Sequence, residues 1–231
     1  MEFMFPPVPP VFLPIAGKTS VFPVHRVYCV GRNYVEHAQE MGATGREPPF
    51  FFMKPADAVC YAGPSAGLRW PYPSLSKNVH HEIELVVAIG TGGKDIAATD
   101  AQRHILGYAV GLDMTRRDLQ NDMKKQGRPW CIGKGFEGAA PIAAITPVDA
   151  AGAIENAHIA LTVNQQQRQS GAISQLIWTI AETIAQLSSA WELQAGDLIF
   201  TGTPAGVGAV SPGDILHGTI DGLEDVVLHV V

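Results

Sequence analysis

Charge and cysteine are both scarce in this sequence. Charged residues make up 16% of the 231 positions, and acidic residues exceed basic ones, for a formal net charge of -6. No basic patch or stripe of the kind that binds nucleic acid stands out, which argues against that class of partner. The three cysteines, Cys29, Cys60 and Cys131, are odd in number and far apart. They predict no disulfide framework and no zinc or redox site with C-x-x-C spacing, so we expect a cytoplasmic protein.

Long uninterrupted apolar runs are also missing. The most apolar stretch, residues 139–163, contains Pro141, Pro147, Asp149 and Glu155, so it is not expected to cross a bilayer as one helix. The first residues have no basic region and are crowded with prolines, unlike a signal peptide. We therefore expect no membrane contact. Hydrophobic residues nevertheless make up 46% of the chain, which is enough for a sizeable core in one or two domains.

Proline is concentrated at the start of the chain. Residues 1–24 contain prolines at positions 6, 7, 9, 10, 14 and 23. Each proline fixes its own φ and biases the preceding residue toward extended geometry. This segment is therefore predicted to be an extended arm that lies against the body or against a partner subunit.

Two glutamates alternate within a strand-like stretch. If residues 82–88 form a strand, Glu82 and Glu84 share one face, while Ile83 and Leu85 point into apolar packing. Two neighbouring carboxylates repel each other unless a cation lies between them, and an all-oxygen site suits Mg²⁺, Mn²⁺ or Ca²⁺ better than zinc. The alternative is a solvated strand face, but the apolar residues that follow argue for a buried strand.

A third carboxylate ends another apolar stretch. Residues 106–112 resemble a strand, and Asp113 follows at its end, which makes it a candidate third ligand. Residues 114–122 are polar and helix-like, so Asp113 is equally suited to be the N-cap of that helix. Both interpretations stay open at this point.

A short helix is predicted between Asn33 as N-cap and Gly42 as its end. His37 and Glu40 are three residues apart and would share one face of it. A glutamate beside a histidine can orient the imidazole and raise its basicity, as a general base requires. A solvated pair is the other interpretation. The polar loop that follows, residues 43–49, suggests a lid.

Glycine-rich segments supply further candidates. Lys134 lies between Gly133 and Gly135, which allows a ligand to approach the backbone closely, although the nucleotide-binding G-x-x-x-x-G-K-[ST] pattern is missing. The loop at residues 201–208 offers hydroxyls and free amides that could hold a carboxylate, though turn formation explains it equally well. Residues 173–187 carry apolar side chains at helical spacing and predict a core helix.

Taken together, six motifs resemble the fumarylacetoacetate hydrolase family along nearly the whole length from Val27 onward. The motifs are Gly31-Arg32-Asn33-Tyr34 with His37 and Glu40, Phe51-Phe52-Met53-Lys54-Pro55, His81-Glu82-Ile83-Glu84, Asp113 with Arg117-Asp118-Leu119-Gln120, Gly133-Lys134-Gly135-Phe136, and Thr201-Gly202-Thr203-Pro204-Ala205-Gly206-Val207-Gly208. Within the family, residues 30–34 and 47–52 are most similar to the bacterial fumarylpyruvate hydrolases of the gentisate pathway.

The resemblance implies an α+β, mostly β fold of rolled mixed β-sheets with flanking helices, like that of the C-terminal domain of fumarylacetoacetase. It implies a homodimer, with residues 1–24 as the arm and residues 25–231 as the catalytic domain, which includes a lid segment at about 33–49. It also implies Mg²⁺ or Mn²⁺, with Ca²⁺ as a third candidate, held by Glu82, Glu84 and Asp113. The resemblance thus favours Asp113 as a ligand.

The implied activity is that of a hydrolase acting on carbon–carbon bonds in ketonic substances. Fumarylpyruvate and water would give fumarate and pyruvate in aromatic degradation. The residues implied to activate water and to stabilise the oxyanion at C4 are His37, Glu40, Arg117, Gln120 and Lys134. The residues implied to bind the substrate are Thr203 and Gly202 at its carboxylate, and Arg32 and Lys54 at the distal carboxylate of a fumaryl group.

Two other readings remain. Related family members are acylpyruvases, decarboxylate oxaloacetate, or isomerise and decarboxylate hydroxymuconate-like diacids, and decarboxylation needs no activated water. A different class is a metal- or sugar-binding β module without catalysis. The acidic residues together with His37, Glu40 and Lys134 argue against that class, because a binding module needs no base.

Overall fold

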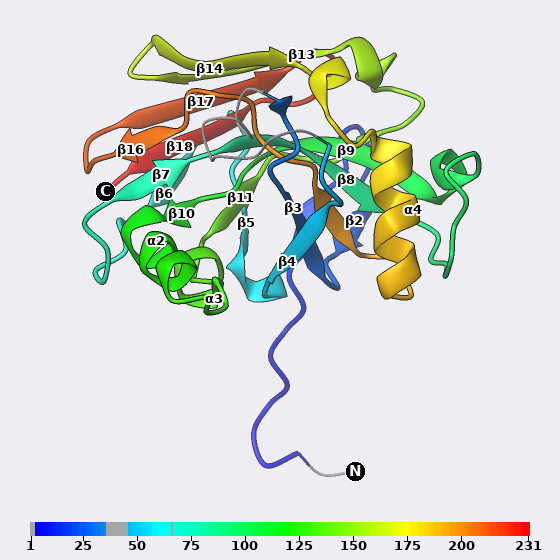
Figure 1. Cartoon of the computed structure of the whole chain (residues 1–231), viewed down its shortest axis with the longest axis horizontal. Coiled ribbons are helices and arrows are strands. Elements are labelled where there is room, and N and C mark those ends of the chain that lie inside the picture. Colours follow the sequence, from blue (N-terminus) through cyan, green and yellow to red (C-terminus); the bar gives the residue numbers. More distant parts are fainter. Residues whose placement is uncertain (1–2, 36–45, 66) are drawn as a thin grey trace.

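The computed structural model describes residues 3–35, 46–65 and 67–231. Figure 1 shows curved sheets that lie over one another, with the helices placed around them. Within this part of the chain the strands form four sheets, and no helix is long and apolar enough to cross a membrane. The expected mostly β, α+β fold of rolled mixed sheets is confirmed.

The largest sheet forms the centre of the molecule. In the described chain its strands run in the order β4-β3-β15-β8-β9-β11-β5, and β12 pairs with β9. The sheet is mixed, because β15 pairs in parallel with β3, and β11 with β5, whereas the other pairs are antiparallel. The strands are β3 (Val27–Gly31), β4 (Phe50–Lys54), β5 (Val59–Tyr61), β8 (Ile83–Ile89), β9 (Ile105–Leu112), β11 (Ala140–Ile142), β12 (Thr146–Pro147) and β15 (Leu198–Phe200).

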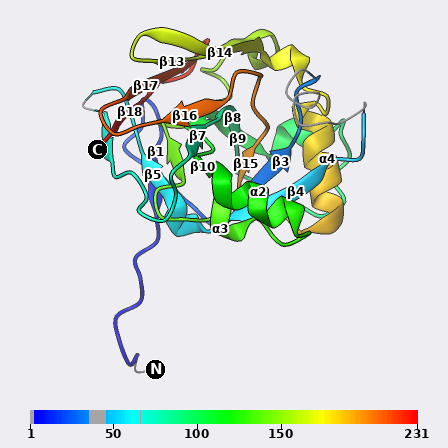
Figure 2. The same cartoon turned by 60° about the vertical axis from the view of Figure 1, so that its left-hand side comes forward.

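Smaller sheets cover and extend this centre. One has the order β14-β13-β17-β18-β6, another the order β10-β7-β16, and a third consists of β1 and β2. Figure 2 shows β13, β14, β17 and β18 as a layer above the strands of the central sheet. The bounds are β1 (Phe12–Pro14), β2 (Val21–Pro23), β6 (Leu68–Trp70), β7 (Val79–His81), β10 (Thr115–Arg116), β13 (His158–Val163), β14 (Gln166–Ala172), β16 (Gly208–Val210), β17 (Ile215–Ile220) and β18 (Val226–Val230).

Strand β8 is buried along its whole length. Ile83 and Leu85 pack into one apolar cluster, whereas Val86 and Ala88 pack into a second cluster on the other face. Because side chains alternate along a strand, Glu84 shares the face of the second pair. The sequence therefore places a carboxylate inside a strand that is covered on both sides, as predicted, and not on a solvated face.

The helices differ in their bounds from the predicted ones. Those in the described part of the chain are α2 (Arg117–Lys125), α3 (Cys131–Lys134) and α4 (Ile180–Ala190), with short 3-10 turns η1 (Ala56–Ala58), η2 (Ala101–His104), η3 (Ile154–Asn156) and η4 (Ile173–Gln175). The helix predicted over residues 114–122 begins three residues later, because Thr115 and Arg116 pair with β7. Asp113 is therefore not the N-cap of that helix.

The prediction of one helix over residues 173–187 is wrong. The chain instead forms η4 and then α4, which begins after Thr179, where Thr179 and Glu182 form a capping box. The side chain of Asn33 accepts a hydrogen bond from the Trp178 backbone N–H and donates one to the Trp178 carbonyl. These long-range hydrogen bonds hold the backbone at Trp178 in a non-helical conformation between η4 and α4. The spacing of apolar residues alone does not reveal this interruption.

Candidate metal centre

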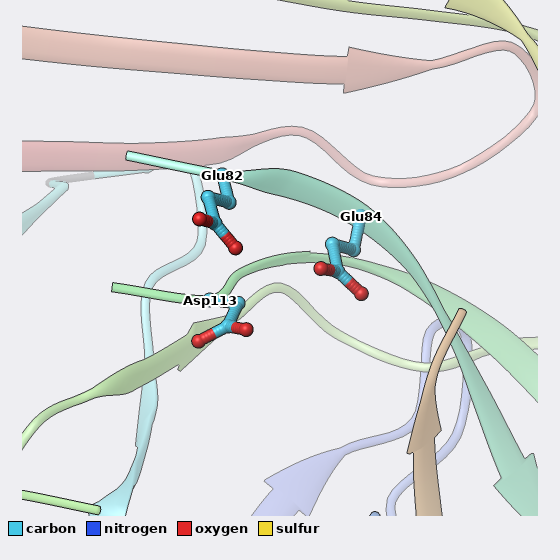
Figure 3. Close-up of side chains that lie close together, drawn as sticks. All are labelled: Glu82, Glu84 and Asp113. Atoms are coloured by element: carbon cyan, nitrogen blue, oxygen red, sulfur yellow. The ribbon is translucent and has the colours of Figure 1, made fainter. Parts of the chain in front are cut away.

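Three carboxylates meet at the end of the β8–β9 pair (Figure 3). Glu82 immediately precedes β8, Glu84 lies within it, and Asp113 follows β9. The antiparallel register pairs Ile83 with Leu112, and the Asp113 N–H donates to the Glu82 carbonyl at 2.8 Å. Each carboxylate is at most 5% exposed, and their ligand oxygens lie within 4.8 Å of one another.

Three buried cations surround these carboxylates. Lys134 Nζ lies 2.8 Å from Glu82 Oε2 and 2.6 Å from Asp113 Oδ2. Lys54 Nζ lies 2.8 Å from Asp113 Oδ1, and Arg117 Nη2 donates to Glu82 Oε1. Burial alone would lower the pKa of Lys134, but Asp113 and Glu82 raise it above its usual value, which keeps the ammonium charged. Buried ions of this kind depend on one another, because removal of one leaves its partner uncompensated.

Glu84 is the carboxylate that lacks such compensation. Among the described residues it forms no ion pair, and its Oε2 accepts only the Gly202 N–H, at 2.6 Å. Burial, followed by the charges of Asp113 and Glu82, raises the pKa of Glu84 well above its usual value. Asp113 Oδ1 is buried and, despite the nearby Lys54, accepts no hydrogen bond in the described chain. A divalent cation coordinated by the three carboxylates would satisfy both groups, and oxygen donors suit Mg²⁺ or Mn²⁺.

A pocket opens over the triad. Its polar lining comes from six chain segments and consists of Arg32, Glu82, Glu84, Asp113, Arg117, Gln120, Lys134 and Thr203. Its apolar wall includes Phe50, Phe52 and Trp130, and the Trp130 ring packs within 5.4 Å of Phe50 and 5.8 Å of Phe52, centroid to centroid. The sequence does not predict this wall, because the phenylalanines also fit a buried strand and none of the six motifs includes Trp130.

The first turn of α2 supplies polar groups to the pocket. Arg117 Nη1 donates to Gln120 Oε1 at 2.5 Å, as expected of residues three apart on a helix. Arg117 Nε donates to His80 Nδ1 at 3.4 Å. Burial and the Arg117 charge lower the pKa of His80 to about 4, so this imidazole is neutral at pH 7 and can accept that hydrogen bond. His80 thus helps to hold Arg117 toward Glu82.

Arg32 lines the pocket in an unusual conformation. Its φ is +57°, a left-handed backbone geometry that residues other than glycine rarely adopt. Its Nε is buried and has no hydrogen-bond partner in the described part of the chain. The guanidinium lies 5.8 Å from the centroid of the Phe50 ring. The side chain is therefore a strong donor with bonding capacity left for an anion.

Some predicted site residues lie elsewhere. Lys54 does not line the pocket, since its Nζ donates to the Lys134 carbonyl at 2.5 Å and pairs with Asp113. Gly202 contributes its N–H to Glu84. His37 and Glu40 lie outside the described residues, as does most of the expected lid. The end of that segment is held just before α4, where Trp178 Nε1 donates to the Glu47 carbonyl at 3.0 Å.

Comparison with known proteins identifies the family of the chain. Residues 26–231 match the model of the fumarylacetoacetate (FAA) hydrolase C-terminal family. The chain belongs to the fumarylacetoacetate hydrolase family. The fold and the family expected from the sequence motifs are thereby confirmed.

Relatives in this family carry more than one activity. The chain is 43% identical to a fumarylpyruvate hydrolase of Ralstonia sp, over 80% of this chain and 93% of the relative. It is 41% identical to the oxaloacetate tautomerase YcgM of Escherichia coli (strain K12), over 89% of this chain and 93% of the relative. Among solved structures, a fumarylpyruvate hydrolase from Pseudomonas aeruginosa in complex with Mn²⁺ and pyruvate is 54% identical, with a TM-score of 0.97, over 100% of this chain and 99% of that one.

Proposed function

We propose that this chain is a Mg²⁺- or Mn²⁺-dependent enzyme that hydrolyses fumarylpyruvate to fumarate and pyruvate in the cytoplasm. The observation that carries the proposal is the buried triad of Glu82, Glu84 and Asp113 at the base of a pocket lined by Arg117, Lys134 and other polar groups. The 54% identity to a fumarylpyruvate hydrolase that binds Mn²⁺ and pyruvate supports this substrate.

The carbonyl end of the substrate lies over the triad in this proposal. A bound Mg²⁺ or Mn²⁺ would supply a Lewis acid that draws electron density from the 2-oxo group. Lys134 and Arg117 add positive charge beside Glu82, and with Gln120 they stabilise the oxyanion that forms at C4. Thr203, which lines the pocket, binds the carboxylate next to the 2-oxo group.

Water is activated by His37 in this proposal, with Glu40 orienting the imidazole. His37 takes a proton from water, and the water oxygen bonds to C4. The C4 carbonyl then re-forms as the C3–C4 bond breaks. The electron pair stays on C3, which takes the proton back from His37. Fumarate and pyruvate are the two products, and the atoms of the added water are divided between them.

Arg32 binds the distal carboxylate of the fumaryl group. Its place in the pocket lining and its unpartnered Nε support this role. Lys54 is the weaker candidate, because it pairs with Asp113 and does not line the pocket. Recognition of both ends of a diacid would separate fumarylpyruvate from acylpyruvates that have only one carboxylate.

A panel of substrates tests this specificity. With Mn²⁺ or Mg²⁺, we expect kcat/KM for fumarylpyruvate to exceed that for acetylpyruvate by at least about tenfold, because a hydrogen bond to a charged group contributes about 1.5–3 kcal/mol. Arg32→Gln should remove most of this difference and leave the value for acetylpyruvate nearly unchanged. Equal kcat/KM values in the unaltered protein would contradict the assignment of Arg32.

A second activity is favoured by the 41% identity to an oxaloacetate tautomerase. Tautomerisation or decarboxylation of oxaloacetate could use the same cationic groups around the triad without an activated water. Oxaloacetate therefore belongs in the same panel. Turnover of oxaloacetate with a higher kcat/KM than fumarylpyruvate would assign the chain to that activity instead.

We also propose that the chain is a homodimer in which the N-terminal arm lies against the partner. Residues 3–10 are exposed and run away from the body in Figure 1. Phe3, Phe5 and Val8 are 64%, 72% and 83% exposed, and no charged residue occurs between positions 3 and 17. An uncharged apolar arm in water is costly, and a second copy would cover it.

The arm predicts a measurable contribution to dimer stability. Replacement of residues 3–10 by a Gly/Ser segment of equal length should raise the dimer dissociation constant by at least about tenfold, because burial of one large apolar side chain contributes about 1.5–3 kcal/mol. Sedimentation equilibrium of both proteins provides the measurement. An unchanged dissociation constant, or a monomeric parent protein, would contradict the proposed role of the arm.

A further inference from the structure

Gln169 is a buried amide on an otherwise exposed strand. It lies on β14, where Gln166, Gln167 and Arg168 are exposed, yet only 1% of its own surface is exposed. Its Oε1 accepts from Ile83 N at 3.1 Å and lies 2.9 Å from His81 Nδ1. Its Nε2 donates to Thr203 Oγ1 and to the Pro204 carbonyl, both at 2.8 Å. All four hydrogen-bonding positions of the amide are therefore used.

The backbone partners fix the orientation of this amide. Ile83 N–H can only donate, so its partner must be the oxygen of Gln169, and the Pro204 carbonyl can only accept, so its partner must be the nitrogen. His81 Nδ1 therefore carries the proton that it shares with Gln169. Of the natural side chains of this length, only glutamine supplies an acceptor on one side and two donors on the other.

The amide connects two parts of the candidate site. His81 and Ile83 flank Glu82 in the sequence, and Thr203 lines the pocket above the triad. Gln169 itself does not line that pocket. Gln169, which comes from a neighbouring sheet, thus connects two parts of the site. One is the segment around Glu82, a candidate metal ligand, and the other is the loop that carries Thr203, a candidate substrate contact.

Gln169 also determines what Thr203 can offer a ligand. The Thr203 hydroxyl donates to the Ile83 carbonyl at 2.7 Å and accepts from Gln169. The hydroxyl proton is therefore already used in a hydrogen bond. A substrate carboxylate can only accept hydrogen bonds, so it needs a different donor. The Thr203 main-chain N–H makes no hydrogen bond to the described residues, so it is an unused donor of a residue that lines the pocket.

We propose that Gln169 is a positioning residue, whose amide holds the Thr203 loop so that the Thr203 main-chain N–H points to the substrate carboxylate. The proposal rests on the proposed function in one respect, namely that Thr203 contacts this carboxylate. It adds a residue outside the pocket that sets substrate affinity. Because the contact is made in both ground and transition states, its loss should raise KM more than it lowers kcat.

Two variants each remove both donations of the amide to the Thr203 loop. Gln169→Glu keeps the oxygen that faces His81 and Ile83 but loses both donations to the loop, whereas Gln169→Met loses all four hydrogen bonds at similar volume. Gln167→Glu is the matched control, because it makes the same change at an exposed position of the same strand. Folding of each variant is checked by its thermal melting temperature, and either Gln169 variant suffices if the other does not fold.

The measurement is calorimetric binding of Mn²⁺, and then of pyruvate to the Mn²⁺-loaded protein. For each folded Gln169 variant we expect the pyruvate dissociation constant to rise at least about tenfold, since about one net hydrogen bond to a charged group is lost. The Mn²⁺ dissociation constant should change less than about threefold, a difference of about 0.65 kcal/mol. Gln167→Glu should match the unaltered protein in both. In turnover, KM should rise while kcat falls less than about threefold.

Three results would overturn the proposal. The first is pyruvate affinity in the Gln169 variants equal to that of the unaltered protein. The second is an equal loss of Mn²⁺ affinity, which would mean that Gln169 supports Glu82 and not the loop. The third is an unaltered, Mn²⁺-loaded protein that binds no pyruvate. Pyruvate binding without fumarylpyruvate turnover would instead refute the proposed function and leave the role of Gln169 intact.

Discussion

Replacement of Glu84 by glutamine is expected to weaken Mn²⁺ binding strongly and, with it, to slow fumarylpyruvate hydrolysis. Glu84 is the triad member without an ion-pair partner in the described chain, and burial next to Asp113 and Glu82 raises its pKa. The substitution keeps the shape of the side chain and removes the charge that a cation would compensate. Residues that only orient a metal ligand already contribute about 10–100-fold to metal affinity. Because Glu84 is itself a candidate ligand, we expect the Mn²⁺ affinity to fall at least about a hundredfold.

Asp113→Ala should have the same effect on Mn²⁺ and should also lower stability. It leaves Lys54 without its carboxylate and Lys134 with Glu82 alone, and an uncompensated buried charge costs about 3–5 kcal/mol. Glu137→Gln is the control, because Glu137 is an exposed carboxylate three residues beyond Lys134. Calorimetric Mn²⁺ titration of each protein is the measurement. Mn²⁺ binding by Glu84→Gln with unaltered affinity would refute the triad as the metal site.

His37→Ala is expected to slow fumarylpyruvate hydrolysis by at least about a hundredfold, the lower end of what a general base contributes. Any oxaloacetate decarboxylation should fall much less, because that reaction needs the cationic groups around the triad but no activated water. Lys134→Ala should instead slow both reactions, since Lys134 contacts Glu82 and Asp113 at the centre of the site.

A surface histidine–carboxylate pair provides the control for His37. His217 Nε2 lies 2.8 Å from Asp225 Oδ2 on the surface, and 46% of the His217 side chain is exposed. His217→Ala should leave both reactions unchanged in steady-state assays. If His37→Ala leaves hydrolysis intact, the base is another group. If it slows both reactions equally, His37 positions the substrate instead of activating water.

The candidate metal site was partly predictable because two of its candidate ligands, Glu82 and Glu84, are local in sequence. Glu82 and Glu84 are two residues apart, so strand alternation alone placed them on one face. Asp113 could not be assigned in this way, since its place beside Glu82 depends on the pairing of β8 with β9. The motif resemblance supplied that ligand, and the start of α2 at Arg117 removed the competing interpretation as a helix cap.

The sequence did not predict which polar side chains are buried in the fold and which line the pocket. The sequence makes Lys54 and Arg32 equal candidates for a distal carboxylate, yet Lys54 pairs with Asp113 and only Arg32 lines the pocket. Nothing in the sequence singles out Gln169, because it occurs in a polar run in which Gln166, Gln167 and Arg168 are exposed. For Lys54 and Gln169 the decisive fact is a contact with residues far away in the chain.

The most direct test of metal-dependent hydrolysis is a product analysis on one sample of metal-free protein. Fumarylpyruvate is added first, and one equivalent of Mn²⁺ per chain follows, while fumarate and pyruvate are quantified by NMR. The account predicts that neither product forms above the uncatalysed rate before Mn²⁺ and that both then appear in equal amounts. Formation of both products at the full rate without metal, or no formation after Mn²⁺ is added, would contradict it.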